Sequence, residues 1–549
     1  MCGIGFCKKC ELNDGTIELL KRRGPDCYNT KRIEKQELIF YGSVLSQQGI
    51  GIQSQPLEAE DIILLFNGEI YDHPELVRKD NEISDSLWLS QKISSYKWNI
   101  DEILLCLSKI KGEFAFVVYN KIENEILFGR DRLGRRSLLI SAYQDQFRLV
   151  SVGEDNSLLE LPADGLYFGR VNDLLQLKRF RYEAGTIVES HHLKEFIFLN
   201  SLKSLVDIDR VLEEDAQTIN IEDAKYTDNN YPSYWTFSQN FTGNSEEDYK
   251  TRVSKAFENS IYRRVKYHKG NIGILFSGGL DCSLVAYYTL KYIADQGLKT
   301  QVDLFSVAFG KGEEDYEKCP DRITANSSFE QIRFLFPSAH LSLVKINISK
   351  SDLEKKRKTV IKHLINPRVS VLDDSIGSAL WFAAQGKSNE ECTVLLSGLG
   401  ADELFCGYSQ HRRIHDREGI EALGLDVQNM IERIAERNCG RDDRVISDSG
   451  RELRLPFLDL DFIQTGNNNL SAICDFDVIF VVSNVPITNR CNLTLERGEG
   501  EKLLLRQIAR EIGLDEISKL EKRAIQFGSR IAKMTKTKQK GNYISPDLL

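Results

Sequence analysis

The sequence predicts two domains: a first α+β domain of layered antiparallel sheets with helices, and a second, parallel α/β domain. Three observations lead to this prediction. The chain has 549 residues, and a single hydrophobic core seldom grows past roughly 250–300 residues. Up to about residue 185 the apolar runs are short and are separated by Gly, Asn or Asp, as in sheets joined by tight turns. From about residue 245 strand-like runs are followed by long helical runs, which is typical of a parallel sheet.

The first domain is expected over residues 2–185. Its predicted strands are LIFYGSVL, DIILLFNGEIY, GEFAFVVYN, EILFGRD, FRLVSVG and GLYFGRV. Helical periodicity is found mainly in SDSLWLSQKISSY and DEILLCLSKI. Residues 186–244 are acidic and polar with weak periodicity, which predicts a linker or a surface excursion. The second domain is expected over 245–535, and 536–549 are expected to form a solvated polar tail.

The composition is that of a globular enzyme, with 41% hydrophobic and 28% charged residues. The chain has 72 basic and 81 acidic residues, for a net charge of −9, so we expect no general attraction to nucleic acid. No apolar run reaches the 18 or so residues that span a bilayer, so we expect neither membrane association nor a signal peptide. Twelve cysteines are scattered apart from Cys7 and Cys10, which lack a partner pair at zinc-site spacing. We therefore expect reduced thiols and a cytoplasmic protein.

The most specific local pattern is NIGILFSGGLDCSLVAYYTLKYIA. Residues 271–276 are predicted to form a strand and Ser283–Ala294 a helix, with a turn from Ser277 to Ser283 between them. Two glycines allow the backbone amides to approach an anion, and the helix start adds N–H donors and a positive dipole. No lysine follows the glycines as it does in kinases and GTPases. The alternative is an ordinary glycine turn between a strand and a helix.

This turn resembles the pyrophosphate loop of ATP pyrophosphatases, with Cys282 in place of the first of two serines. Three later segments are similar to asparagine synthetases, and they read LLSGLGADELFCGY (395–408), RLPFLDLDFI (454–463) and EGEKLLLRQIARE (499–511). The resemblance implies an adenine nucleotide hydrolase-like fold and the cofactors ATP and Mg²⁺. It implies that the adenosine packs on Leu275 and Val307. It implies that the phosphates lie on Ser277, Gly278, Gly279, Asp281, Cys282, Ser283, Ser397 and Gly398.

The same resemblance implies that Asp281 and Asp402 hold Mg²⁺. It also implies that Lys522 steadies developing negative charge, although Lys519 is a rival and a plain surface lysine is the alternative. A Gly278→Val change is expected to clash with the pyrophosphate and to leave the fold intact. The alternating charges at 441–444 could be only a structural ion network.

The N-terminal part resembles a type-2 glutamine amidotransferase domain, an N-terminal-nucleophile hydrolase. The residues that carry this are MCGIGF, Arg23–Asp26, FNGEIYDH, ISDS, GEFAFVVYN and GRDRLGRRSLL. By resemblance Cys2, freed by removal of Met1, attacks the side-chain amide of glutamine and uses its own amine as the base. Asn67 and the Gly68 N–H would hold the oxyanion, and Glu69 and Asp85 would bind glutamine. The alternatives are a turn at Asn67–Gly68 and a helix N-cap at Asp85.

Nearly the whole chain resembles the asparagine synthetase domain-containing proteins. The additional segments are RVSVLDDSIGSALWFAAQG, RNCGRDDRVISD, PDRITA and KRAIQFGSRIAKM.

Three positions depart from the asparagine synthetase pattern. Residues 41–56 contain no arginine to grip the α-carboxylate of glutamine, so we expect weak glutamine affinity unless Gln47, Gln48 or another group compensates. Leu399 replaces a glutamate of the reaction centre, and leucine can neither accept a proton nor pair with a cation. Ser137 replaces a proline, which we expect to matter less.

Three functions follow as hypotheses. The first is a glutamine-hydrolysing ligase of asparagine biosynthesis that activates aspartate or another carboxylic acid as an acyl-adenylate, with small molecules as its only partners. The second keeps the ATP pyrophosphatase chemistry but uses a different acceptor. The third is a non-catalytic protein that binds nucleotide or a protein partner, and an intact Cys2 and phosphate loop argue against it. The acceptor, the pathway and the oligomeric state stay open.

Overall fold

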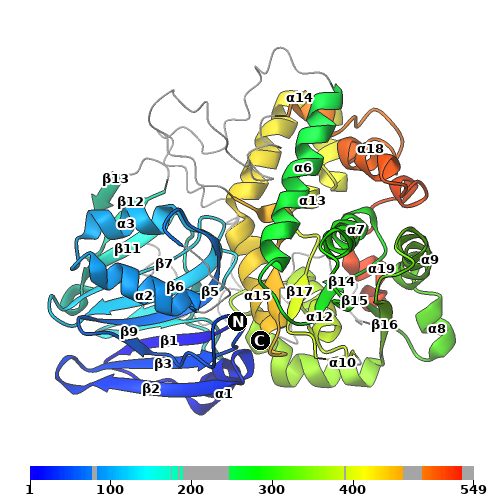
Figure 1. Cartoon of the computed structure of the whole chain (residues 1–549). Coiled ribbons are helices and arrows are strands. Elements are labelled where there is room, and N and C mark those ends of the chain that lie inside the picture. The colour runs from blue at the N-terminus through cyan, green and yellow to red at the C-terminus, as the bar shows by residue number, and fades with distance from the viewer. Residues whose placement is uncertain are drawn as a thin grey trace, which may run out of the picture.

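The computed structural model consists of two units that lie side by side, one rich in antiparallel strands and one with a parallel sheet among helices (Figure 1). It describes residues 1–76, 83–174, 176–182, 186–189, 246–388, 391–460, 482 and 485–534. The expected tail and most of the expected linker lie outside the described residues.

Two antiparallel sheets form the N-terminal unit, as the sequence predicts. The first has the strand order β10-β8-β9-β1-β3-β2 and the second β13-β12-β11-β7-β6-β5-β4. The first sheet consists of β1 (Gly3–Lys8), β2 (Cys27–Ile33), β3 (Leu38–Val44), β8 (Leu139–Tyr143), β9 (Gln146–Val150) and β10 (Leu159–Glu160). The second consists of β4 (Leu57–Glu58), β5 (Ile62–Asp72), β6 (Lys111–Asn120), β7 (Glu125–Arg130), β11 (Gly165–Arg170), β12 (Lys178–Arg181) and β13 (Thr186–Glu189). The strand β13 pairs with β12, so the second sheet continues four residues past the expected domain end at 185.

Strand periodicity explains how these sheets are layered. Along β5, Ile63 and Leu65 face a core shared with the first sheet, whereas Leu64 and Phe66 face a core shared with two helices. This alternation is the period of two that a strand buried on both faces requires. The helices are α2 (Asp85–Ser95) and α3 (Ile100–Ser108), and both were predicted from the sequence. A third helix, α1 (Asp14–Arg23), was not predicted.

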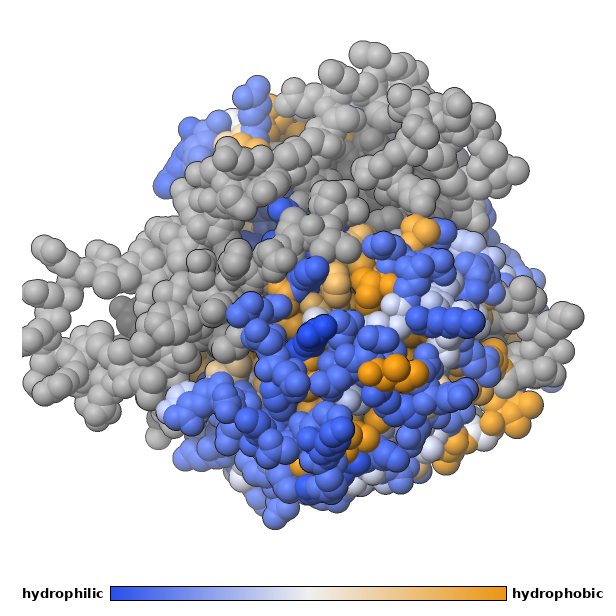
Figure 2. Space-filling view, turned by 90° about the vertical axis from the view of Figure 1, so that its left-hand side faces the viewer, coloured by the Kyte–Doolittle hydropathy of each residue, from blue (hydrophilic) through white to orange (hydrophobic). Residues whose placement is uncertain are grey.

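The outer face of this unit is largely hydrophilic, and its hydrophobic residues form small separate groups (Figure 2). In this unit, Ile122 and Tyr143 are 74% and 54% exposed. Singly scattered apolar residues of this kind are normal on a folded surface. No helix among the described residues combines the length and apolar character that a membrane crossing requires.

The C-terminal unit is built on a five-stranded sheet in which every neighbouring pair is parallel. Its strands are β14 (Ile272–Leu275), β15 (Val302–Phe309), β16 (Leu341–Ile348), β17 (Val394–Leu396) and β18 (Glu452–Arg454). Their order is β16-β15-β14-β17-β18. From β14 the chain proceeds to one side of the sheet and from β17 to the other. The carboxyl ends of β14 and β17 therefore form a topological switch point, where open α/β sheets bind ligands.

Helices that follow the strands cover this sheet, and α7, α9 and α12 pack directly on it. The predicted helix after the glycine turn is present, beginning at Leu280 rather than Ser283. The helices of this unit are α6 (Glu246–Val265), α7 (Leu280–Asp295), α8 (Glu313–Glu317), α9 (Pro320–Leu335), α10 (Lys350–Lys356), α11 (Lys362–Ile365), α12 (Val371–Ala384), α13 (Ala401–Leu404), α14 (Ser409–Glu432), α15 (Gly440–Ser447), α17 (Ile487–Arg490), α18 (Leu503–Glu511) and α19 (Ile525–Gly528).

Candidate functional site

The first candidate centre surrounds Cys2, which lies just before β1. The Cys2 backbone nitrogen donates a hydrogen bond to Asn67 Oδ1 at 3.1 Å. Asn67 lies in β5 and is fully buried, and its Nδ2 has no partner among the described residues. A buried amide therefore holds the Cys2 nitrogen with its oxygen and keeps an N–H donor free for an anion.

The backbone N–H of Gly68 lies on the same open edge of β5. The N–H of Phe66 points away from β6 and donates to Gln55 Oε1 at 2.7 Å. The N–H of Ile70 likewise donates to Asp85 Oδ2 at 2.6 Å. Alternate residues of a strand direct their N–H groups to the same side, so the Gly68 N–H points to the edge between these two contacts. Asn67 and Gly68 thus supply a pair of donors beside Cys2.

The alternative interpretations of these residues are wrong. Asn67 and Gly68 lie inside β5 and not in a turn. The N-cap of α2 is Ser84, whose side chain accepts from the Leu87 N–H, and Asp85 is the first helical residue. Glu69 faces the domain boundary, where its carboxylate lies 3.5 Å from Arg454.

Gln55 is a contributor to this centre that sequence reasoning missed. It is 2% exposed, its Nε2 donates to the Phe66 carbonyl at 2.9 Å, and the same atom lies 3.5 Å from Cys2 Sγ. Gln47, a candidate replacement for the missing arginine, accepts instead from Thr393 in the other domain at 3.1 Å. Neither amide carries a positive charge, so either would hold a carboxylate through neutral hydrogen bonds, which are weaker than the charge-assisted bonds of an arginine.

Burial governs the reactivity of Cys2. Removal from water raises the pKa of its thiol, so the group is protonated at neutral pH and needs a base to become a nucleophile. Arg23 donates from Nε to the Cys2 carbonyl at 3.3 Å. Met1 is itself buried, and its amine lies 3.7 Å from Glu452 in the C-terminal unit.

The second candidate centre is the loop at the carboxyl end of β14, at the switch point. Thr324 Oγ1 donates to the Ser277 carbonyl at 2.6 Å, and Ser328 Oγ donates to the Gly278 carbonyl at 2.7 Å. Both donors lie on α9, so this helix braces the loop through its carbonyl groups. Ser283 N–H to Gly279 O, at 3.1 Å, closes the first turn of α7. The N–H groups that precede Ser283 therefore belong to a helix N-terminus, which favours an anion.

The two glycines of this loop have different roles. Gly278 has φ +76°, and a Cβ there would overlap the backbone of Thr324 and Ala325. The expectation that a side chain at Gly278 would leave the fold intact is therefore wrong, because it would collide with α9. Gly279 has φ −71°, and a Cβ there would approach only Ser277 Oγ at 3.4 Å. Gly279 is thus the glycine that faces open space.

A cluster of alternating charges lies beside the loop. Lys502 Nζ is 2.5 Å from Asp281 Oδ2 and 2.7 Å from Asp402 Oδ1, and Lys522 pairs with the other oxygen of Asp402. Lys519, the rival of Lys522, is 62% exposed and pairs with Glu516 at the surface. Lys522 is therefore the one of the two that reaches the cluster. Sequence reasoning missed Lys502, although it is the lysine of the segment EGEKLLLRQIARE.

The electrostatics of the cluster favour an ionised Asp402. Burial acts to raise the pKa of Asp402, but the ammonium groups of Lys502 and Lys522 outweigh it and hold that pKa well below its ordinary value. Asp281 Oδ1 is buried and has no hydrogen-bond partner among the described residues. The two carboxylates and this free oxygen fit Mg²⁺, which normally takes one or two carboxylates and completes its shell with phosphate oxygens and water. No group of three or more His, Cys, Asp or Glu in the described part forms a metal site by itself.

The other residues predicted for this centre surround the same loop. Val307 in β15 is 7% exposed and Leu275 at the end of β14 is partly buried. The backbone of Gly398 lies directly against Asp281, because a Cβ there would be 2.9 Å from the Asp281 Cβ. Leu399 donates its N–H to Ser397 Oγ at 3.3 Å, and its side chain packs on the hydrophobic core.

The charges at 441–444 form a structural ion network, the interpretation considered from the sequence. Asp443 is fully buried and accepts from Arg23 Nη2 at 2.8 Å and from the Ser137 N–H at 3.1 Å. Arg444 donates to Ser137 Oγ at 2.7 Å and to Glu160 at 2.6 Å. These contacts cross from one unit to the other. Ser137 matters more than the sequence suggested, because a proline there has no N–H for Asp443.

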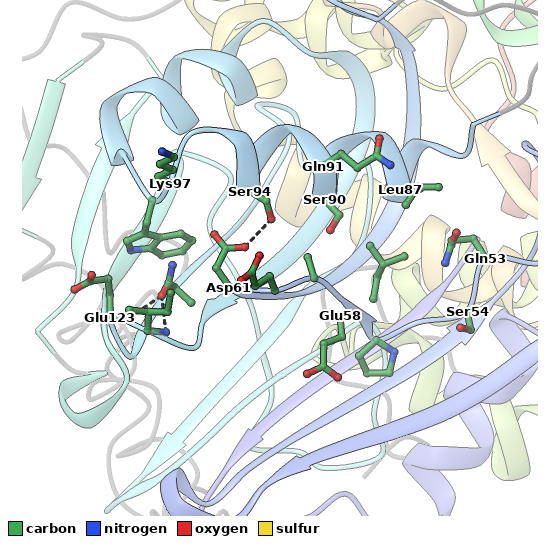
Figure 3. A pocket seen from close by; sticks show the side chains of 17 residues that line it. Gln53, Ser54, Glu58, Asp61, Leu87, Ser90, Gln91, Ser94, Lys97 and Glu123 are labelled. Atoms are coloured by element: carbon green, nitrogen blue, oxygen red, sulfur yellow. Dashed lines mark hydrogen bonds between the residues drawn. The ribbon is translucent and has the colours of Figure 1, made fainter.

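A groove with a volume of about 970 Å³ lies apart from both centres, between α2, β4 and the turn from β6 to β7 (Figure 3). None of the site residues predicted from the sequence lines it. Two of its carboxylates have partners: Asp61 accepts from Ser94 at 2.8 Å, and Glu58 pairs with Lys31 at 2.7 Å. We assign no ligand to it.

Comparison with known proteins matches both units to known families. Residues 252–424 match the asparagine synthase family and residues 44–159 match a glutamine amidotransferase domain. The chain is 33% identical to an asparagine synthetase domain-containing protein of Drosophila melanogaster, over 100% of both chains. It is 32% identical to asparagine synthetase domain-containing protein 1 of Homo sapiens, over 98% of this chain and 96% of that one. The glutamine-hydrolysing asparagine synthetase of Gallus gallus is 23% identical over 80% of this chain and 71% of that one.

Proposed function

The chain belongs to the asparagine synthetase domain-containing proteins, and from this premise we propose that it is a glutamine- and ATP-dependent amide-forming ligase of the asparagine synthetase type. One observation carries the proposal. In one domain, the Cys2 thiol lies beside the donors Asn67 Nδ2 and Gly68 N–H. In the other, the loop after β14 is braced by α9 and lies beside the Lys502 charge cluster at the switch point. A protein that only binds partners needs neither.

In the first domain Cys2 attacks the side-chain amide carbon of glutamine to form a thioester, and ammonia leaves. Removal of Met1 turns the Cys2 nitrogen into an amine, and Asn67 Oδ1 already holds that nitrogen at 3.1 Å. The amine takes the thiol proton, which the thiol retains at neutral pH because it is buried. Asn67 Nδ2 and the Gly68 N–H hold the oxyanion, an arrangement typically worth 10²–10³-fold in turnover per donor. Asp85 binds the α-amino group of glutamine, and the thioester is then hydrolysed.

In the second domain a carboxylate attacks the α-phosphorus of ATP and displaces pyrophosphate. Ammonia then attacks the acyl-adenylate and AMP leaves. The loop from Ser277 to Ser283, with Ser397 and Gly398, holds the phosphates, and Lys522 offsets negative charge as it develops. Asp281 and Asp402 would hold Mg²⁺, which when bound neutralises phosphate charge. Lys502 keeps these two carboxylates together.

A second candidate function keeps this chemistry and changes the acceptor. Leu399 favours it, because its apolar side chain packs on the core beside the loop, where the asparagine synthetase pattern has a carboxylate. A pocket without that carboxylate loses a partner for ammonium or for a proton. An acceptor that needs no such partner suits this site better than aspartate.

Pyrophosphate exchange into ATP separates these functions. The purified chain is mixed with Mg·ATP, labelled pyrophosphate and one carboxylic acid at a time, with aspartate first. Exchange with aspartate supports asparagine synthesis, and exchange with another acid alone supports the second function. Absence of exchange with every acid, together with stabilisation by Mg·ATP, overturns both in favour of a nucleotide-binding protein. Cys2→Ala should leave exchange unchanged, because the thiol belongs to the other domain.

A further inference from the structure

Two cysteines at the end of β1 form a pair that neither candidate centre uses. Cys7 is the fifth residue of β1 and is fully buried, and Cys10 follows the strand and is partly exposed. Both cysteines lie against the same hydrophobic core. Cys7 pairs with Arg148 of β9 across the sheet, and Cys10 Sγ lies 3.7 Å from the carbonyl oxygen of the preceding residue, Phe147. Between them the chain bends at Lys9, whose φ is +54° and whose N–H donates to the Glu37 carbonyl at 2.9 Å. Strand pairing on one side and this bend on the other place both cysteines beside the start of β9.

The surroundings of Cys10 favour a thiolate. The thiol of Cys7 has the largest effect on the pKa of Cys10 and lowers it, and Arg148 and the backbone near Phe147 act in the same direction. Together they lower the pKa of Cys10 to about 7, against about 8.5 for an ordinary cysteine. The pKa of Cys7 is raised, first by the contact with Cys10 and then by burial. One sulfur is thus reactive and accessible, and its neighbour is protected.

We propose that Cys7 and Cys10 form a redox-active dithiol that a small-molecule disulfide converts reversibly into an intramolecular disulfide. The Cys10 thiolate attacks one sulfur of the small molecule, whose other half leaves as a thiolate. Cys7 then loses its proton to solvent and attacks the Cys10 sulfur of the mixed disulfide, and the second half leaves as a thiolate. The protein loses two electrons and two protons, and the small-molecule disulfide is reduced to two thiols.

Two other parts of the chain provide matched comparisons. Cys406 and Cys491 also lie together in one hydrophobic cluster, but they are 0% and 2% exposed, so a reagent in solution cannot reach them. Cys27 is partly exposed like Cys10, but its sulfur accepts from Asn29 Nδ2 at 3.2 Å and not from a second thiol. Cys406 and Cys491 therefore test two neighbouring cysteines that solvent does not reach, and Cys27 tests a solvent-accessible cysteine whose sulfur is held by an amide instead of a second thiol.

The test is incubation of the reduced full-length chain with oxidised glutathione at neutral pH, followed by alkylation and peptide mass spectrometry. We expect a Cys7–Cys10 cross-link that dithiothreitol reverses, while Cys406 and Cys491 stay reduced. Cys7→Ala should stop the reaction at a mixed disulfide on Cys10. It should also slow alkylation of Cys10 near pH 7 several-fold, because the thiolate loses its hydrogen-bond donor.

Cys27→Ser should leave the cross-link unchanged. A wild-type chain in which glutathione stays on Cys10 without cross-linking would refute the assignment of Cys7. A chain in which Cys10 reacts no faster than Cys27 would refute the proposed activation. If Cys7→Ala fails to fold, the alkylation rate of Cys10 against Cys27 in the wild-type chain decides the question.

Discussion

Neutralising Glu452 should destabilise the folded chain by about 3 kcal/mol at neutral pH. Glu452 lies in β18 at 1% exposure, 2.7 Å from Arg454 Nε and 3.4 Å from Arg136 Nη2. Burial acts to raise its pKa, but the two guanidinium groups outweigh burial and lower the pKa from 4.5 to about 2. A difference of about 2.5 in pKa, at about 1.36 kcal/mol for each pKa unit, gives about 3 kcal/mol. Loss of one partner of a buried ion pair typically costs 3–5 kcal/mol.

The sign of the pH dependence follows from the lowered pKa. Because the folded chain binds the proton more weakly than the unfolded chain, the stabilisation is complete above pH 4.5 and is lost as the pH falls toward 2. Glu452→Gln should therefore differ from the wild type at pH 7 and approach it at pH 3. Glu11 offers a matched control, because its partner Arg32 lies at 2.8 Å on the open surface, where an ion pair contributes little.

Urea unfolding is measured at both pH values, with tryptophan fluorescence as the signal. Trp88 and Trp381 are buried in the first and second domains, so the signal reports both. A Glu452→Gln loss below about 1 kcal/mol at pH 7 would refute the linkage reasoning, as would a loss of equal size at pH 3. Glu11→Gln should leave the transition in place at either pH.

Three further predictions concern the two centres. Gly279→Val should abolish stabilisation by Mg·ATP and keep the melting temperature of the free chain. Gly278→Val should instead lower the melting temperature of the free chain, because its side chain meets α9. Thermal shift assays with and without nucleotide measure both effects, and equal stabilisation of wild type and Gly279→Val by Mg·ATP would contradict the prediction. Asn67→Ala should lower glutamine hydrolysis by about 10²–10³-fold and leave ammonia-dependent synthesis unchanged, and ammonia release measures the first. Leu399→Glu should raise amide formation from aspartate and free ammonia, by up to the 10²–10⁴-fold that a proton-transferring group contributes; no gain in product formation would show that another residue fills this role.

Much of the fold could be predicted because its patterns are local. The run from 61 to 71 became β5 at Ile62–Asp72, and the helical periodicity near 85 and 101 became α2 and α3. Strand period and apolar spacing depend on residues only a few positions apart, which is what a single sequence displays. The helix α1 was missed because its ten residues, DGTIELLKRR, combine five charges with few apolar positions.

The candidate centres were predictable only where a motif is contiguous. The turn from Ser277 to Ser283 shows its glycines within seven residues. Lys502, in contrast, meets Asp281 from 221 positions along the chain, and no spacing rule connects them. The same holds for Gln55, whose amide reaches the Cys2 thiol from 53 positions along the chain. Contacts of this kind come from the tertiary packing of distant segments, which propensity and periodicity do not encode.

The charged boundary between the two units limits how they can move. Arg264 of one unit pairs with Glu113 of the other at 2.9 Å, both fully buried, and Arg23 and Asp443 form a second such pair across it. If one unit slid over the other by even one residue position, these charges would stay buried away from water but lie opposite the wrong partners. Each unpaired buried charge lowers the stability of the folded chain. The boundary therefore holds the two units docked in a single register, and it disfavours sliding displacements of one over the other.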